Sequence, residues 1–143
     1  MKLQIATRHA VFAILELAAH DGQMSAGEIA EKYGLSPNHL AKVLRTLGRE
    51  GMVEASRGVG GGYRFAGNAK RLTLLDIMQI FEPIGVPGAG NSEPGDDTDE
   101  GRALRQVTDE IEDITRATLS SITVDTMLKI VRRTRKGAAR PGG

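Results

Sequence analysis

A glycine-rich stretch between two short β-forming segments limits the fold of this chain most strongly. Its sequence is Arg57-Gly58-Val59-Gly60-Gly61-Gly62, and residues 52–56 and 63–66 flank it with short strand-like patterns. Glycine readily adopts the positive φ angles that tight hairpin turns need. The pattern therefore predicts a β-hairpin with a glycine-rich tip.

Two capped helical segments precede this hairpin. Ser25 and Glu28 have the spacing of a capping box, and the segment that they open would end at Gly34. Ser36-Pro37 supplies a capping residue followed by proline at the first helical position, and this second segment would run to Glu50. Helix, tight turn, helix and hairpin, in this order, predict a winged helix-turn-helix.

Further helices are expected on both sides of this unit. One would begin with Thr7 as its N-cap and run to about His20, and another would begin at Thr73 and continue until Pro83 ends it. Residues 1–83 would thus form a DNA-binding domain of the winged helix-turn-helix type. The fold class is mainly α, with a short β-hairpin wing and a long C-terminal dimerisation helix.

The rest of the chain divides into three segments. Residues 84–101 are rich in Gly, Pro and acid and predict a mobile acidic loop. Residues 102–131 predict a long helix to about residue 121 and a short terminal helix from Thr123. Residues 132–143 predict a disordered basic tail.

A narrow apolar seam marks the long helix, at spacings of three and four residues. Its members are Leu104, Val107, Ile111 and Ile114. Such a seam fits a helix that packs against another helix, and little else in the chain is left to cover it. The same helix of a second copy is the natural cover, so we expect a homodimer with two-fold symmetry.

Charge is segregated along the chain, although the net charge is only +1. Residues 1–81 carry 10 Lys or Arg and 7 Asp or Glu, residues 82–131 carry 4 and 11, and residues 132–143 carry 5 and 0. A basic first domain followed by an acidic segment suggests that the first domain faces a polyanion.

The start of the second helix of the pair carries side chains suited to double-stranded DNA. In a winged helix-turn-helix this helix enters the major groove, which here would bring five polar residues to the DNA: Ser36, Asn38, His39, Lys42 and Arg45. Asn can bond adenine through two atoms, and Lys and Arg suit guanine or phosphate. The alternative is an ordinary polar helix face, in a winged-helix module that binds protein and does not read DNA sequence.

The hairpin tip adds a second predicted contact. Arg57 would insert its cation into a narrow minor groove, while Gly60 and Gly61 let the backbone approach closely. The structural alternative, in which the glycines only satisfy turn geometry, is compatible with this role. The glycines lead into a strand rather than a helix, which disfavours a dinucleotide-binding loop.

Several other classes are excluded or disfavoured. The chain has no cysteine, which removes disulfides, thiolate ligands and thiol nucleophiles. No nucleophile signature surrounds any histidine, so we expect no catalytic site and no enzyme. We expect no secretory signal, no membrane span, no metal site and no cofactor, and hence a cytoplasmic protein.

The chain resembles the Rrf2 family of bacterial transcription regulators. Two segments carry the resemblance, LSPNHLAKVLRTLGREGMVEASRGVGGGYRFA (35–66) and LTLLDIMQIFEP (72–83), and it extends over most of residues 1–131. It implies a sequence-specific DNA-binding regulator, with repression as the favoured action, that binds a pseudo-palindromic operator as a dimer through residues 102–121. It assigns DNA contacts to Arg57 and to Ser36, Asn38, His39 and Lys42.

Within the family, residues 36–42 look more like the nitric-oxide-sensing regulators than the regulator of iron–sulfur assembly. The latter has a glutamate where this chain has Ala41. A different operator is therefore implied.

The chain also departs from the family. Many members hold an iron–sulfur cluster on three cysteines in the loop equivalent to residues 87–103, where this chain has none. We therefore expect no cluster, and a response that passes through residues 87–101 and the dimer helix. A small molecule beside Ile84 and Val86, a partner protein or no effector at all remain open. The acidic residues of the loop do not follow the EF-hand pattern, which favours a solvated loop over a hard-metal site.

Overall fold

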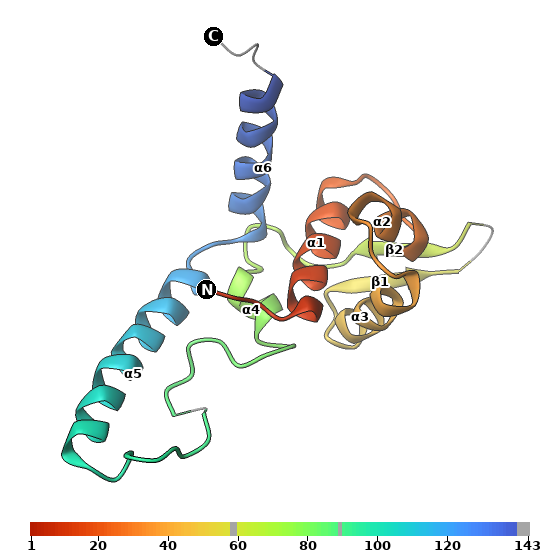
Figure 1. Ribbon diagram of the computed structural model, residues 1–143. Helices are drawn as coiled ribbons and strands as arrows, with labels where there is room; N and C mark the ends of the chain where they lie inside the picture. Colours follow the sequence, from red (N-terminus) through yellow and green to blue (C-terminus); the bar gives the residue numbers. More distant parts are fainter. Residues whose placement is uncertain (58–59, 89, 140–143) are drawn as a thin grey trace.

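The computed structural model describes residues 1–57, 60–88 and 90–139 of the chain. The elements are α1 (Ile5–Ala19), α2 (Ala26–Tyr33), α3 (Pro37–Arg49), β1 (Val53–Ser56), β2 (Gly62–Phe65), α4 (Leu74–Met78), α5 (Asp99–Ser120) and α6 (Val124–Ala139). Figure 1 shows α1 to α4 and the hairpin gathered in one unit, from which α5 and α6 project in different directions. The predicted mainly helical fold, with a helix-turn-helix, a two-stranded hairpin and a long later helix, is confirmed.

The turn between α2 and α3 is built as the sequence predicts. The Ser25 hydroxyl accepts a hydrogen bond from the backbone N–H of Glu28 (3.1 Å) at the start of α2. Gly34 ends this helix with φ +66°, a left-handed conformation that glycine adopts without steric cost. Two residues later Ser36 caps α3, and Pro37 occupies its first position. These local signals fix the angle at which α3 leaves α2.

The hairpin is antiparallel, with Val53 opposite Phe65 and Ser56 opposite Gly62. The backbone of Tyr63 also pairs with Met24, in the segment before α2, through hydrogen bonds of 2.9 and 2.7 Å. A Cβ atom on Gly62 would lie 2.4 Å from the Met24 carbonyl oxygen. Glycine at this position therefore permits a close backbone approach that anchors the wing to the helix-turn-helix.

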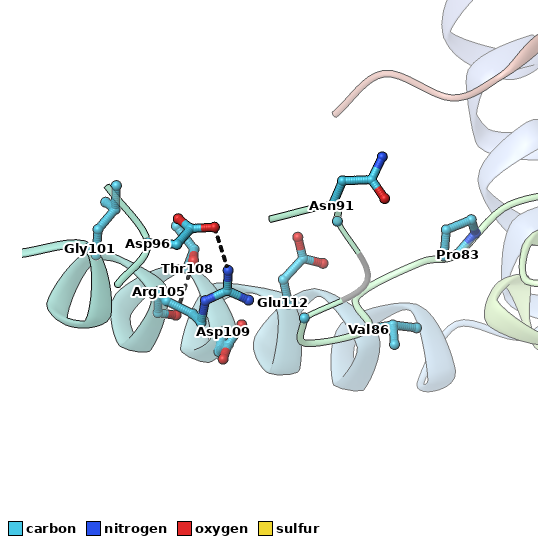
Figure 2. Close-up of a pocket in the computed structure, with 12 residues that line it drawn as sticks. Pro83, Val86, Asn91, Asp96, Gly101, Arg105, Thr108, Asp109 and Glu112 are labelled. Atoms are coloured by element: carbon cyan, nitrogen blue, oxygen red, sulfur yellow. Dashed lines mark hydrogen bonds and ion pairs between the residues drawn. The ribbon is translucent and has the colours of Figure 1, made fainter. Parts of the chain in front are cut away.

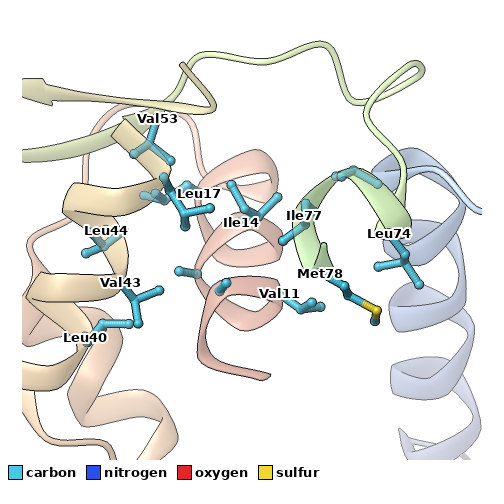
Figure 3. Packing of buried hydrophobic residues seen from close by; sticks show 14 of the residues in the cluster. Val11, Ile14, Leu17, Leu40, Val43, Leu44, Val53, Leu74, Ile77 and Met78 are labelled. Atoms are coloured by element: carbon cyan, nitrogen blue, oxygen red, sulfur yellow. The ribbon is translucent and has the colours of Figure 1, made fainter. Parts of the chain in front are cut away.

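The core lies around α1. Ile14 and Leu17 of α1 are fully buried among residues of α3 and α4, such as Leu44 and Ile77 (Figure 3). Removing each such side chain from water stabilises the fold by about 1.5–3 kcal/mol. The same core therefore holds α3 against α1 and leaves the opposite face of α3 to solvent.

Glu16 adds a polar connection between α1 and α2. Its carboxylate accepts hydrogen bonds from the Tyr33 hydroxyl (2.7 Å) and from Lys32. The Tyr33 ring stacks on Phe12 of α1, with centroids 4.8 Å apart. The Lys32 and Tyr33 hydrogen bonds hold the pKa of Glu16 below its usual value, although its partial burial opposes this effect.

The first helix begins earlier than predicted. Its N-cap is Gln4 rather than Thr7, and Thr7 is a fully buried residue inside the helix. The Gln4 N–H donates to the Glu82 carboxylate at 2.8 Å, so a residue far along the chain satisfies the start of α1. This tertiary contact outweighs the local preference for threonine as a cap.

The helix after the wing is shorter than predicted. It begins at the expected place, where Thr73 is the N-cap and forms a capping box with Asp76, but it ends at Met78 instead of continuing to Pro83. Beyond it, three-residue closures from Ile80 to Ile77 and from Phe81 to Met78 occur beside a four-residue closure from Glu82 to Met78. Three-residue turns of this kind are common at helix C-termini.

The C-terminal segments are more helical than predicted. Thr98 caps α5, so residues 99–101 belong to the helix and not to the loop. Helix α6 runs to Ala139, so residues 132–139 are helical and do not form a disordered tail; residues 140–143 lie outside the described residues. Arg and Lys favour helix and interact well with its C-terminal end, which explains how a basic segment extends α6.

Candidate nucleic-acid interface

Helix α3 has one buried face and one exposed polar face. Leu40, Val43, Leu44 and Leu47 are buried. Asn38, Lys42 and Arg45, three of the predicted DNA contacts, are exposed on the other side. The helix thus presents an amide and two cations in adjacent turns to whatever lies outside the core.

Ser36 and His39 have additional tasks in the structure. The Ser36 hydroxyl accepts from the His39 backbone N–H at 3.4 Å, which is the capping bond of α3, and Ser36 is exposed. His39 is half-buried, and its Nδ1 lies 2.9 Å from Nδ1 of His9 in α1. Of the five predicted residues of this helix, His39 is therefore the one engaged with the core.

The sequence did not identify His9 as a partner of the candidate interface. It lies 30 residues before His39, and no periodicity or motif connects the two. The rings meet edge to face, with centroids 4.9 Å apart and an interplanar angle of 74°. Burial lowers the pKa of His9, and the charges of His39 and Arg8 lower it further.

The wing places its cation next to the end of β1. Arg57 is exposed, and Gly60 on the far side of the tip has φ +75°. Gly61 is also exposed, while Gly58 and Val59 lie outside the described residues. The Gln23 side chain donates to the Gly60 carbonyl at 2.9 Å and also bonds to the Ser56 hydroxyl. Gln23 thus braces the base of the tip, a contact that the sequence did not predict.

The cations of the interface have no carboxylate partner within the described part of the chain. Ion pairs occur at Glu16, Glu54, Asp96, Asp99 and Asp125, and none of them involves Lys42, Arg45 or Arg57. These charges are therefore available to an external anion. Phosphates and the acceptor-rich edge of guanine are the groups that such cations bind in DNA.

Helix α5 carries an exposed apolar stripe. Leu104, Val107, Ile111 and Ile114 are 64%, 54%, 57% and 66% exposed. The opposite side of the helix is in contact with the chain, where Arg116 donates to the Ile84 carbonyl at 3.3 Å and Gly85 lies against the backbone of Glu112. All four side chains of the apolar stripe are more than half exposed, as we expect of a helix face that packs against a second copy.

The segment before α5 folds back over that helix. A cleft of about 280 Å³ lies between them, lined by Val86 and Asn91 on one side and Leu104 and Glu112 on the other. Asp96 and Arg105, which also line it, form an ion pair of 3.0 Å (Figure 2). Ile84, which we expected beside an effector, is buried. It does not line this cleft.

Within the residues described, no helix has the length and apolar character needed to cross a bilayer.

Comparison with known sequences connects these features to a family. The pattern of the Rrf2 family, described as an iron-dependent transcriptional regulator, matches residues 3–130. BadM of Rhodopseudomonas palustris, named as a transcriptional regulator of the helix-turn-helix type, is 49% identical over 142 residues. This match covers 96% of the present chain and 90% of BadM.

Solved structures agree with the sequence match. CymR of B. subtilis, named as a global cysteine regulator, superposes with a TM-score of 0.76 at 27% identity, covering 91% of this chain and 98% of CymR. IscR of T. potens gives 0.68 at 28% identity, covering 100% and 94%. The matched family and BadM are regulators rather than enzymes. Because the family pattern spans nearly the whole chain and BadM is about half identical throughout, this chain belongs to the Rrf2 family of transcriptional regulators.

Proposed function

We propose that the chain is a sequence-specific DNA-binding regulator that acts as a homodimer in the cytoplasm. The exposed polar face of α3 carries this proposal. Asn38, Lys42 and Arg45 lie on that face. Lys42 and Arg45 lack ion-pair partners among the described residues.

Each element has a distinct proposed role. Helix α3 enters the major groove, where Asn38 bonds an adenine edge and Lys42 and Arg45 bond guanine or phosphate. Ser36, at the N-terminus of the helix, lies near a phosphate. The wing places Arg57 in the adjacent minor groove, where a narrow groove concentrates negative potential.

The α5 stripe supports the dimer. Two copies that bury Leu104, Val107, Ile111 and Ile114 against each other would relate their α3 helices by a two-fold axis. The half-sites of a pseudo-palindromic operator then lie about one helical turn, roughly 34 Å, apart. A dimer that occupies such an operator blocks access to the DNA beneath it, so we propose repression as its action.

We further propose that the regulator works without the iron–sulfur cluster that its resemblance to the family implies. The donor set does not fit a thiolate-held cluster, because the chain has no cysteine and its three histidines, His9, His20 and His39, all precede β1. Within the described residues, no group of three His, Asp or Glu side chains is placed to hold a metal ion. The signal, whatever its source, then passes through the loop and α5 without metal–thiolate chemistry.

The cluster proposal is tested by purifying the protein without oxygen. A colourless product with no stoichiometric iron, whose DNA binding is unaffected by oxidant or nitric oxide, is expected. Visible absorption bands together with bound iron would overturn this part of the proposal.

Gel-shift experiments on genomic fragments, with random DNA as competitor, test the main proposal. We expect a few fragments to stay bound in the presence of the competitor, and binding to weaken sharply when the salt concentration is raised fourfold. Equal binding of every fragment would show that the protein does not bind DNA in a sequence-specific way. Absence of DNA binding would instead favour the protein-interaction module.

A further inference from the structure

A histidine pair connects the core to the DNA-facing helix. His9 of α1 is 9% exposed and His39 is the third residue of α3, half-buried. Their Nδ1 atoms are 2.9 Å apart, which is the length of a hydrogen bond. This contact ties the N-terminal turn of α3, where Asn38 is exposed, to the interior of the domain.

The pair can hold its hydrogen bond only in certain protonation states. Two ring nitrogens at this distance need one hydrogen between them, so one Nδ1 donates and the other accepts. A neutral pair and a pair with one added proton both meet this requirement. A second added proton would put two imidazolium rings in contact, and their repulsion in a partly buried site prevents it.

His9 is the accepting ring of the pair. Burial, the charge of His39 and the charge of Arg8 all lower the pKa of His9, so His9 stays neutral and accepts. Helices α3, α4 and α6 and strand β2 pack against α1, and Lys42 and Arg45 of α3 have no ion-pair partner among the described residues. Asp76 of α4 bonds Thr73, and Arg64 of β2 is paired with Glu54. Arg135 of α6 acts on Glu16.

We propose that His9 is a positioning residue for DNA recognition. Its Nδ1 accepts a hydrogen bond from the Nδ1–H of His39, which holds the His39 ring in place. The contact supports a protonated His39 whose Nε2–H serves as a donor to DNA. The inference rests on the proposed function of α3. Neutral His39 could offer either a donor or an acceptor at Nε2, whereas the protonated ring offers a donor in every case. Base edges and phosphates in the major groove are mostly acceptors, so DNA binding should take up a proton.

The test measures the affinity for one operator fragment from the gel-shift screen between pH 8 and pH 5.5. For the wild-type chain we expect affinity to rise as pH falls, by at most about tenfold per pH unit, because one proton is taken up. His39→Gln should bind with little dependence on pH. His20→Gln is the matched control, because His20 is exposed at the end of α1 and outside the pair; it should keep the wild-type profile.

Two variants of His9 separate positioning from general stability. In His9→Gln the amide oxygen can still accept a hydrogen bond from His39, so the rise in DNA affinity should keep its midpoint pH. His9→Phe offers no acceptor, so the rise should move to lower pH, in a protein whose thermal unfolding is checked at pH 8. A His39→Gln profile with the wild-type slope, or a His9→Phe profile that coincides with the wild type, would overturn the inference.

An NMR titration of the imidazole nitrogens in the free protein makes this result independent of DNA. His39 should protonate first, while Nδ1 of His9 remains an unprotonated acceptor. Independent titration of the two rings would overturn the pair even if DNA binds as proposed. If no fragment binds at all, the proposed function fails, and the titration still decides whether the pair exists.

Discussion

We expect single side chains on α3 to determine which DNA sequence the protein recognises. Asn38 and Lys42 are exposed one turn apart, on a helix whose other face is locked into the core. Their substitution should therefore leave the fold intact and change only what the helix contacts. Binding measurements on such variants report on recognition directly.

The first prediction concerns these two residues. Asn38→Ala and Lys42→Ala should each weaken operator binding by about 1–3 kcal/mol if the contact is to a base, and binding to random DNA should change much less. Lys70→Ala, at an exposed position outside α3 and the wing, is the matched control. Equal losses on operator and random DNA would reassign the residue to a phosphate contact.

Gly62 yields a prediction about stability. Gly62→Ala would force a Cβ atom to within 2.4 Å of the Met24 carbonyl oxygen, so the hairpin or the Met24 segment must shift. We expect a loss of about 1–3 kcal/mol in the free energy of unfolding. Gly27→Ala is the control, because Gly27 lies in α2 with no atom closer than 3.8 Å to the added carbon. It should be neutral or stabilise by up to about 1 kcal/mol. Denaturant unfolding of both variants measures the difference, and equal stabilities would contradict the structure.

The His9 ring predicts how stability depends on pH. Because its pKa is lowered in the folded protein, the unfolded chain binds the proton more readily. The stability that this group contributes is therefore full above the ordinary value of 6.5 and is lost as pH falls below it. Thermal unfolding of the wild type should lose stability between pH 7 and pH 5.5 more steeply than that of His9→Gln. Parallel curves for the two proteins would show that folding does not lower the pKa of His9.

Among the helices and strands, the sequence correctly predicted those helix ends that are set by contacts between residues close together in the chain. The caps at Ser25, Ser36 and Thr73 and the glycine at Gly34 act within four residues, and each lies where the sequence placed it. The start of α1 was misplaced because its partner, Glu82, is 78 residues away.

The same reasoning explains what was missed in the candidate site. The exposed face of α3 follows from helical periodicity, so Asn38, Lys42 and Arg45 could be found. His9 and Gln23 act across gaps of 30 and 37 residues, on His39 and Gly60, and no spacing in the sequence encodes such contacts. The basic residues after Val131 were interpreted by charge alone, although Arg and Lys are also good helix formers.

Helix α5 gives the prediction that belongs to a whole element. Ile111→Glu places a charge in the middle of the apolar stripe and should convert the proposed dimer to a monomer, because burying an unpaired charge is costly. Gln106→Glu adds the same charge at an exposed position outside the stripe and should remain dimeric. Sedimentation at micromolar concentration distinguishes them. A wild-type monomer, or a dimeric Ile111→Glu protein, would exclude this surface as the interface.

In the whole molecule, the basic and acidic parts occupy different structural units. The helix-turn-helix and wing bear Lys42, Arg45 and Arg57, which form no ion pair among the described residues, whereas the segment before α5 and α5 itself are rich in acid. Electrostatic attraction therefore draws DNA to the first unit and repels it from the second. In the proposed dimer, a change in how the segment before α5 lies on that helix would alter the distance between the two α3 helices. Because the spacing of the two DNA half-sites is fixed, the affinity for the operator would then change.

Specific DNA binding by a dimer is tested by the salt dependence of operator binding, measured together with the number of chains bound per site. Two chains should bind each operator, and the logarithm of affinity should fall linearly with the logarithm of salt concentration, with a slope of about −0.9 for each phosphate neutralised. Affinity that does not change with salt, or one chain per site, would contradict this proposal.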